Sequence, residues 1–305
     1  MRLNRLAQAL VVFLIAGLCS QCLIRLLPGD PIDTLMAETG TSISRAVLLK
    51  ELHLEDPWYI AAPKSLLQAL QGNFGVSLFS KRAIQPILLE RLSRTFSLAS
   101  TALALALALA LPLSLLAAQN FRPTLAKRAS QACDLWATFS AAIPTPWLGP
   151  ILLLLFTVEV RIFPLERHIA LPALTLAFSV GGNWSRLIRD RVRDQVDTSW
   201  FRAARARGKN ELTLLLRDGL APSSSLLVGH LGSQWGALMA GAYITEVLFG
   251  WPGIGSWMIE GVLRRDYPVV QAGVLATSFF ALLGNFLGDF ASTQVDPRGR
   301  GFTQQ

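Results

Sequence analysis

Basic side chains gather in one stretch of this sequence, and they are the first candidates for chemistry. The stretch "FRAARARGKNELTLLLRDGLAP" runs from Phe201 to Pro222, and the wider segment 186–217 holds nine cations against four acids. Such a cluster could bind phosphate, nucleic acid, anionic lipid or a protein surface. Its Gly-Lys pair lacks the earlier glycine and the following Ser or Thr of a phosphate-binding P-loop, so no nucleotide site is predicted.

Residues that usually carry catalysis or bind metals are scattered through the rest of the chain. The three histidines have no zinc-ligand spacing. Cys19 and Cys22 form a C-x-x-C within an apolar run, and Cys133 begins another, so packing is a better interpretation than redox chemistry. The "GIGSW" motif lacks the His and acid partners of a nucleophilic serine. The sequence therefore predicts no catalytic residue, no metal site and no cofactor in this chain.

Composition indicates a membrane protein. Of the 305 residues 52% are hydrophobic and only 16% are charged, and the mean hydropathy is +0.43. Such a chain has too few polar residues to cover a soluble protein of this size. A helix that crosses a hydrocarbon core of about 30 Å needs about 20 apolar residues. Six segments reach or approach that length: Ala7–Leu27, Ser97–Ala118, Leu135–Val158, Ile169–Ser185, Ser223–Thr245 and Pro268–Gly288.

The predicted fold is an all-α polytopic membrane protein with six transmembrane helices. Lys and Arg in short loops mark the cytoplasmic side of a membrane. Here they gather before the first helix, between the second and third, between the fourth and fifth, and after the sixth, so both termini are expected in the cytoplasm. The predicted organisation is a transmembrane helix at 1–27, an extracytoplasmic segment at 28–94, a membrane domain at 95–295 with a cytoplasmic loop at 186–222, and a cytoplasmic tail at 296–305.

Within the cytoplasmic loop, the basic stretch predicts a helix, a glycine turn and a second helix. Asp197 or Thr198 can act as the N-cap of a helix that runs to about Arg207. Gly208 suits the left-handed position that ends a helix, and Asn210 suits the next N-cap.

One face of the first helix is predicted to bind a partner. Trp200, Ala203, Ala204 and Arg207 recur at helical spacing, so two alanines lie where another surface could approach closely, while Arg205 falls on the opposite, solvated face. Three interpretations compete for this face: a DNA-binding helix-turn-helix, an amphipathic loop on anionic headgroups, and a short helix that fills a groove of a cytoplasmic protein. The DNA-binding interpretation is disfavoured because the loop is tethered between two membrane spans.

The same stretch resembles the cytoplasmic coupling loop, or EAA loop, of permease subunits in bacterial ATP-binding-cassette importers. The resemblance is to the peptide and nickel permeases of the dipeptide permease B type, and it covers nearly the whole chain. Arg202 stands where the general pattern has Glu, and the loop "EVRIFPLERH" is shorter than in many such permeases. The motifs that carry the resemblance, in their order along the chain, are "RLLPGDP", "GNFGVSL", "ERLSRTFSLA", "IPTPWLG", "HIALPALTLA", "ITEVLFGWPGIG", "RRDYPVVQ" and "DPRGR".

The resemblance implies a type I importer permease fold in the bacterial inner membrane. It implies four kinds of partner: a second, related permease, two cytoplasmic ATPases that bind ATP and Mg, an extracytoplasmic solute-binding protein, and the lipid membrane, with no nucleic acid. The implied cargo is peptides, nickel or metal-chelate complexes. A secondary transporter driven by an ion gradient is the alternative, although no inverted repeat or mid-membrane ionisable residue supports it. The residues implied to couple to the ATPases are Arg202, Ala203, Ala204, Arg207, Gly208, Leu220 and Pro222.

Residues of the translocation pathway are harder to identify. Ser233, Gln234 and Glu246 are the predicted pathway or gate residues, together with Trp147, because a polar group near the membrane requires water or a partner. Four glycines of the fifth span can equally serve helix packing: Gly229, Gly232, Gly236 and Gly241.

Two prolines, Pro144 and Pro146, are expected to break or kink the third span.

Overall fold

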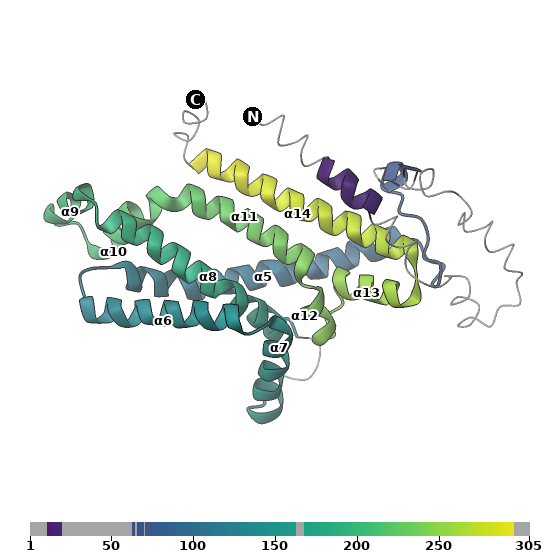
Figure 1. Cartoon of the computed structure of the whole chain (residues 1–305), viewed down its shortest axis with the longest axis horizontal. Coiled ribbons are helices and arrows are strands. Elements are labelled where there is room, and N and C mark those ends of the chain that lie inside the picture. Colours follow the sequence, from purple (N-terminus) through teal and green to yellow (C-terminus); the bar gives the residue numbers. More distant parts are fainter. Residues whose placement is uncertain (1–10, 20–62, 65, 70, 163–167, 296–305) are drawn as a thin grey trace, which may run out of the picture. The chain divides into compact units, whose positions relative to one another are not determined.

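The computed structural model describes residues 11–19, 63–64, 66–69, 71–162 and 168–295, and these residues are mostly helical. Most of the predicted first span Ala7–Leu27, much of the extracytoplasmic segment 28–94 and the tail 296–305 lie outside the described residues. Within them, one isolated bridge joins Val76 and Ala83. The α-helices that carry the fold are labelled in Figure 1: α5 Ile84–Ala118, α6 Pro123–Ala142, α7 Thr145–Leu153, α8 Ala170–Val196, α9 Ser199–Ala206, α10 Glu211–Thr213, α11 Ser224–Gly241, α12 Tyr243–Leu248, α13 Ile254–Arg264 and α14 Tyr267–Val295. Three shorter helical segments of other types lie between them: η1 Leu154–Glu159, η2 Leu214–Leu220 and η3 Ala221–Ser223.

The chain divides into two compact units. Both units draw on segments that are far apart in the sequence, and α5, α11 and α14 each contribute to both. Unit 1 takes in the described parts of Met1–Phe96, Met239–Val247 and Pro252–Leu282, and unit 2 those of Ser97–Leu238, Leu248–Trp251 and Leu283–Gln305.

Two of the described helices, α5 and α14, are long and apolar enough to cross a membrane. A third span is present if α6 and the bent segment Thr145–Glu159 count as one. Helices α8 and α11 form where the fourth and fifth spans were predicted, but their polar side chains leave them less apolar than these three. The six-span prediction is therefore supported in part. Helix α5 begins at Ile84, well before the predicted start of the second span at Ser97, and continues unbroken to Ala118.

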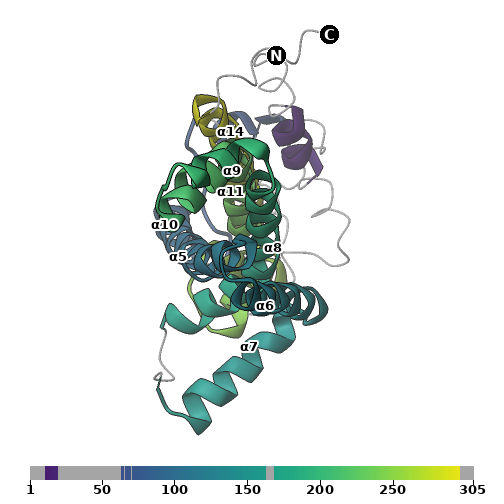
Figure 2. The same ribbon diagram turned by 90° about the vertical axis from the view of Figure 1, so that its left-hand side faces the viewer.

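The predicted break in the third span is confirmed at its two prolines. Helix α6 ends at Ala142, α7 begins at Thr145, and the two segments are bent by 105°. Ile143 is extended, with φ −93° and ψ 110°, because the ring of Pro144 disfavours helical geometry in the residue before it. Figure 2 shows α7 turned away from the axis of α6. The segment Leu135–Val158 is thus not one straight span.

In unit 2, α6 packs closely along α8. A Cβ on Gly181 would lie 2.3 Å from the Trp136 ring, and one on Gly182 would lie 2.8 Å from the Ala137 Cα. The indole Nε1 of Trp136 donates to the carbonyl of Phe178 at 3.0 Å. The small residues of α8 therefore form a surface on which the larger side chains of α6 fit.

Helices α11 and α14 approach each other even more closely in unit 2. A Cβ on Gly232 would lie 2.4 Å from both the Gly284 carbonyl oxygen and the Gly288 Cα, and one on Gly284 would lie 2.9 Å from the Gly236 Cα. Only glycine allows two helix backbones this near to each other, as in small-residue helix contacts within membranes. The packing interpretation is therefore confirmed for Gly232 and Gly236, whereas a Cβ on Gly241 meets open space.

The glycine contact yields a test by substitution. We expect Gly232→Ala to destabilise the protein by about 1–3 kcal/mol, because the added Cβ forces the two backbones apart. The measurement is the thermal midpoint of the detergent-purified protein. Gly229→Ala is the matched control, since its Cβ would meet nothing nearer than the Ser292 Cβ at an ordinary 3.6 Å. Equal midpoints for the two variants would contradict the close contact.

Candidate functional site: the basic loop and the buried polar groups

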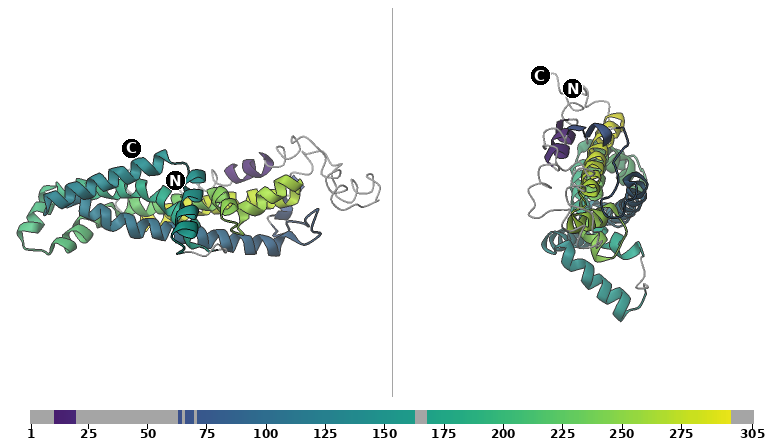
Figure 3. Two further views of the ribbon diagram at one scale, coloured as in Figure 1. Left: turned by 90° about the horizontal axis from the view of Figure 1, so that it is seen from below. Right: turned by 90° about the vertical axis from the view of Figure 1, so that its right-hand side faces the viewer.

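The basic loop folds as its sequence predicts. Thr198 is the N-cap of α9, and its side chain accepts from the Phe201 N–H. Gly208 follows the helix with φ +77°, a left-handed conformation that favours glycine. Asn210 caps the next helix by accepting from the Leu212 N–H. Figures 1 and 3 show α9 and this turn beyond the end of α8.

The buried side of α9 differs from the prediction. Ala204 is 1% exposed and Phe201 also 1%, so both face the interior of unit 2 rather than a partner. They lie among fully buried side chains of α8 and η2, where the ring of Phe201 comes within 3.9 Å of the Cβ position of Gly219. Ala204 is small because it packs inside the loop. Its predicted place on the docking face is therefore wrong.

The other three residues of the predicted face lie on the exposed side of α9. Trp200, Ala203 and Arg207 are all exposed, with Trp200 at 42%, and Arg202 is exposed beside them. Two exposed apolar residues on the next helices, Leu212 at 60% and Leu216 at 41%, were not predicted. Their i, i+4 spacing after the Asn210 N-cap was the available signal. Leu220 is half-buried, and Gly208 and Pro222 are exposed.

Polar contacts fix the position of the loop. Lys209 forms an ion pair with Asp218 at 2.9 Å, which ties the glycine turn to η2. The guanidinium of Arg205 lies 4.5 Å from the centroid of the Phe121 ring and donates to the side-chain oxygen of Asn120 at 3.3 Å. Arg205 is exposed, as predicted, but it also attaches α9 to the turn between α5 and α6.

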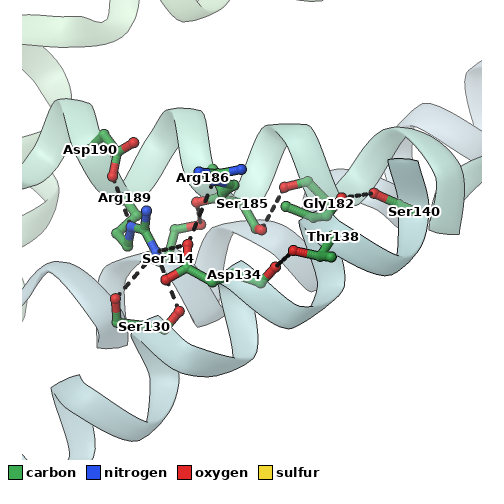
Figure 4. Close-up of polar contacts among 11 residues, drawn as sticks. Ser114, Ser130, Asp134, Thr138, Ser140, Gly182, Ser185, Arg186, Arg189 and Asp190 are labelled. Atoms are coloured by element: carbon green, nitrogen blue, oxygen red, sulfur yellow. Dashed lines mark hydrogen bonds and ion pairs between the residues drawn. The ribbon is translucent and has the colours of Figure 1, made fainter. Parts of the chain in front are cut away.

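Helix α8, which leads into α9, is held to α6 by a buried guanidinium (Figure 4). Arg189 has a side chain only 8% exposed, and it pairs with Asp134 and with Asp190 at 2.8 Å each. It also donates to the Ser130 hydroxyl at 3.2 Å. Burial lowers the pKa of Arg189, but the hydrogen bonds to Asp190 and Asp134 outweigh it and raise that pKa. Sequence reasoning counted Arg189 only as a loop cation.

A buried carboxylate organises unit 1. Glu246 on α12 is 0% exposed, and its Oε2 accepts from the Ser256 N–H at 3.0 Å. Its Oε1 accepts from the hydroxyl of Thr95 at 2.5 Å, and the Thr95 Oγ1 accepts in turn from the Ile254 N–H. Both N–H groups belong to the first turn of α13, where a negative charge is favoured. Glu246 thus caps a helix other than its own.

The glycines of "WPGIG" make this cap possible. A Cβ on Gly253 would lie 2.0 Å from the Glu246 carboxylate, and one on Gly255 would lie 2.4 Å from the Tyr243 Cβ. Any larger residue would expel the carboxylate from the first turn of α13. A polar group near the membrane needs a partner, and the protein itself supplies one for Glu246.

The remaining pathway candidates lie in different surroundings. Ser233 lines a cavity of about 650 Å³ in unit 2, Gln234 is half-buried outside that lining, and Trp147 is 71% exposed on α7. Within unit 2, Ser233, Gln234 and Trp147 therefore lie in three different environments. The cavity lining is Asn183, Leu187, Ser225, Leu226, Gly229, His230, Ser233, Asn285, Asp289 and Ser292.

Residues 110–301 match the family described as "binding-protein-dependent transport system inner membrane component". The chain belongs to this family. It is 29% identical over 300 residues to the glutathione transport system permease protein GsiC of Salmonella paratyphi A, with 97% of each chain covered. It is 27% identical over 316 residues to the oligopeptide transport system permease protein AppB of Bacillus subtilis, covering 97% of this chain and 98% of the relative. It is 28% identical over 315 residues to the probable peptide permease y4tP of Sinorhizobium fredii, covering 98% of each.

The protein is thus an ABC importer permease of the peptide family, integral to the membrane and not itself an enzyme. The family match spans the basic loop 186–222 and Glu246 with the first turn of α13, and the relatives extend the likeness over nearly the whole chain. The resemblance inferred from the motifs is confirmed. Membership in a binding-protein-dependent family also implies ATPase and solute-binding partners.

The Glu246 cap of the permease can be tested by paired substitutions. We expect Glu246→Ala to lower stability by about 1–3 kcal/mol, because it removes the acceptor of the Thr95 hydroxyl and of the Ser256 N–H. Glu246→Gln keeps one carbonyl acceptor and should cost less. Thermal midpoints in detergent measure both effects. Glu260→Ala, at an exposed position on α13, is the control, and an equal loss in all three variants would argue against the cap.

Proposed function

We propose that this permease forms one half of the translocation pathway of an ATP-driven importer of peptides, and that α9 couples it to the ATPases. The observation that carries the proposal is the exposed surface of Trp200, Ala203 and Arg207 on a helix whose other side is packed into unit 2. A short helix with one fixed and one open face suits a groove on a partner protein. The adjacent exposed Leu212 and Leu216 would widen that contact.

The proposed complex holds a second, related permease, two cytoplasmic ATPases and an extracytoplasmic solute-binding protein. ATP and Mg would be bound by the ATPases, since the Gly-Lys of this chain lacks the other residues of a P-loop. Closure of the ATPase pair would pull the coupling helices together and rock the membrane helices between inward-open and outward-open arrangements. Such rigid-body changes require packed units rather than catalytic residues in the permease.

The proposed topology has six spans with both termini in the cytoplasm. Two loop contacts support it. Asp266, in the loop before α14, accepts from the Leu78 N–H at 3.1 Å and from the Ser77 hydroxyl, and both partners belong to the segment expected outside. Arg205 contacts Asn120 and Phe121, in a loop expected inside. Each contact joins two segments that the charge distribution assigns to the same side.

Peptide cargo is favoured over nickel and metal-chelate complexes. The relatives are named for glutathione, for oligopeptides and for peptides. We propose a short peptide or a peptide-like thiol such as glutathione as the solute. The discriminating measurement is ATP hydrolysis by the reconstituted complex, stimulated by its solute-binding protein loaded with each ligand in turn. Stimulation by a nickel complex alone would overturn the peptide assignment.

Substitutions on the two sides of α9 separate coupling from folding. We expect Ala203→Asp to weaken ATPase association at least roughly tenfold, or about 1.4 kcal/mol, because it places an acid inside the contact. The permease should still reach the membrane at normal levels. Ala204→Asp should instead lower those levels, since it buries a charge inside the loop. Co-purification of the ATPases, normalised to permease content, is the measurement.

The control for these substitutions is Ala206→Asp, at an exposed alanine of α9 that is displaced from the Trp200–Ala203–Arg207 face. It should retain more ATPase than Ala203→Asp. If the Ala203→Asp permease keeps its ATPases and transports normally, α9 does not couple the two proteins.

Reporter fusions test the topology. A reporter after Gln305 or within 122–127 should read cytoplasmic, and one near Gly72 should read extracytoplasmic, because Lys and Arg are retained on the inner side during insertion. The measurement is the activity of two reporters, one that is active only in the cytoplasm and one that is active only on the extracytoplasmic side. An extracytoplasmic C-terminus would contradict the importer arrangement.

A further inference from the structure

The cavity of about 650 Å³ in unit 2 lies between helices that an importer places in the membrane. It is open at one side, and its walls come from α8, from the first half of α11 and from the last part of α14. Seven of its ten lining residues have polar side chains, which present hydroxyl, amide, imidazole and carboxylate groups. Leu187 and Leu226 are its two aliphatic side chains.

A surface of this kind does not suit lipid. Polar side chains within membrane helices are costly next to hydrocarbon, and they normally face a protein interior or a water-filled cavity. Asn183 and Asn285 line the cavity and are exposed in the single chain. Three polar side chains of α11, those of Ser225, His230 and Ser233, face this cavity.

The packing around the cavity fixes its shape. On one flank the Gly232, Gly284 and Gly288 backbones are in direct contact and hold α11 against α14. At the wall, the His230 ring packs against the buried Trp184, with 5.0 Å between ring centroids. The Ser233 hydroxyl donates to the His230 carbonyl at 3.0 Å. These contacts hold the three helices that line the cavity, α8, α11 and α14, in one arrangement.

We propose that this cavity is a section of the solute route and that it binds the main-chain amides of a peptide in transit. This inference rests on the proposed function. A peptide amide presents one donor and one acceptor per residue, and Asn and Ser side chains satisfy both. Such a lining contacts the main chain and tolerates different side chains, which suits a permease whose solute is selected by a binding protein.

Cysteine substitution at the lining serines tests water access and contact with the solute. Ser225→Cys, Ser233→Cys and Ser292→Cys are introduced singly into a permease whose Cys19, Cys22 and Cys133 are replaced by Ala, and the complex is assembled with its ATPases and binding protein. A charged, membrane-impermeant thiol reagent should modify all three and abolish most glutathione or tripeptide uptake into proteoliposomes. Uptake conditions with excess peptide should slow the modification severalfold. Ser224→Cys, next in sequence but outside the lining, is the control, and its modification should leave uptake intact.

A second set of variants fills the cavity without a reagent. Gly229 lines it, and a Cβ there meets no atom closer than 3.6 Å, so Gly229→Ala should be tolerated. Gly229→Leu extends a side chain into the space and should reduce uptake severalfold more than Gly229→Ala does. ATPase co-purification and membrane levels should remain normal in both variants.

Three outcomes would overturn the inference. The cysteines could be unreactive in the assembled complex, they could crosslink to the second permease, or their modification could leave uptake unchanged. The first two would make this surface a helix contact instead of a route. Failure of the proposed function is distinct, because the unsubstituted complex would then import no peptide. If excess peptide does not slow the reaction of the three cysteines with the thiol reagent, the assignment of a peptide as the bound solute is also overturned.

Discussion

A charged group that leaves water must find fixed partners, and this requirement organises each of the two units. In unit 1 the Glu246 carboxylate is fully buried and is bound by the Thr95 hydroxyl and by the first turn of α13. In unit 2 the Arg189 guanidinium is bound between Asp134 and Asp190. Breaking a buried pair costs more than the pair contributes, because the remaining charge stays buried without compensation. Both contacts therefore restrict which helix arrangements the permease can adopt.

Close backbone contact supplies the second constraint. Helices in a membrane gain little from burying apolar side chains, since lipid is equally apolar, so they depend on dense packing. The contact of Gly232 with Gly284 and Gly288 provides that density on one side of α11. Ser225, His230 and Ser233 of the same helix line the cavity beside this contact. One helix thus combines a face that cannot separate from its neighbour with a face that can hold water or a solute.

The sequence predicted what local physics determines. The caps at Thr198 and Asn210, the left-handed Gly208 and the break at Pro144 all depend on residues within a few positions of each other. The motifs also identified the family correctly, because their order along the chain is specific even where each one is weak.

The sequence could not predict which side of a helix is buried where local residue spacing makes two sides equivalent. Ala203 and Ala204 are adjacent small residues, and only the packing of Phe201 on α8 and η2 decides that the second is buried. The partners of Glu246 and Arg189 were missed for the same reason. Thr95 is 151 residues from Glu246 along the chain, and Asp134 is 55 residues from Arg189.

These contacts together describe how a pull on α9 would reach the membrane helices of unit 2. The helix is joined to α8 through the buried Phe201 and Ala204, and close-packed interiors transmit displacement because they compress little. Arg189 joins α8 to α6, and the hydroxyl of Ser114 on α5 donates to the Ser185 carbonyl of α8 at 2.9 Å. Helix α8 is thus fixed to both neighbours near the end from which α9 continues. A coupling helix attached at a single flexible linker would swing without moving the bundle, whereas α9 can be displaced only if α8 moves with it or the buried contacts of Phe201 break.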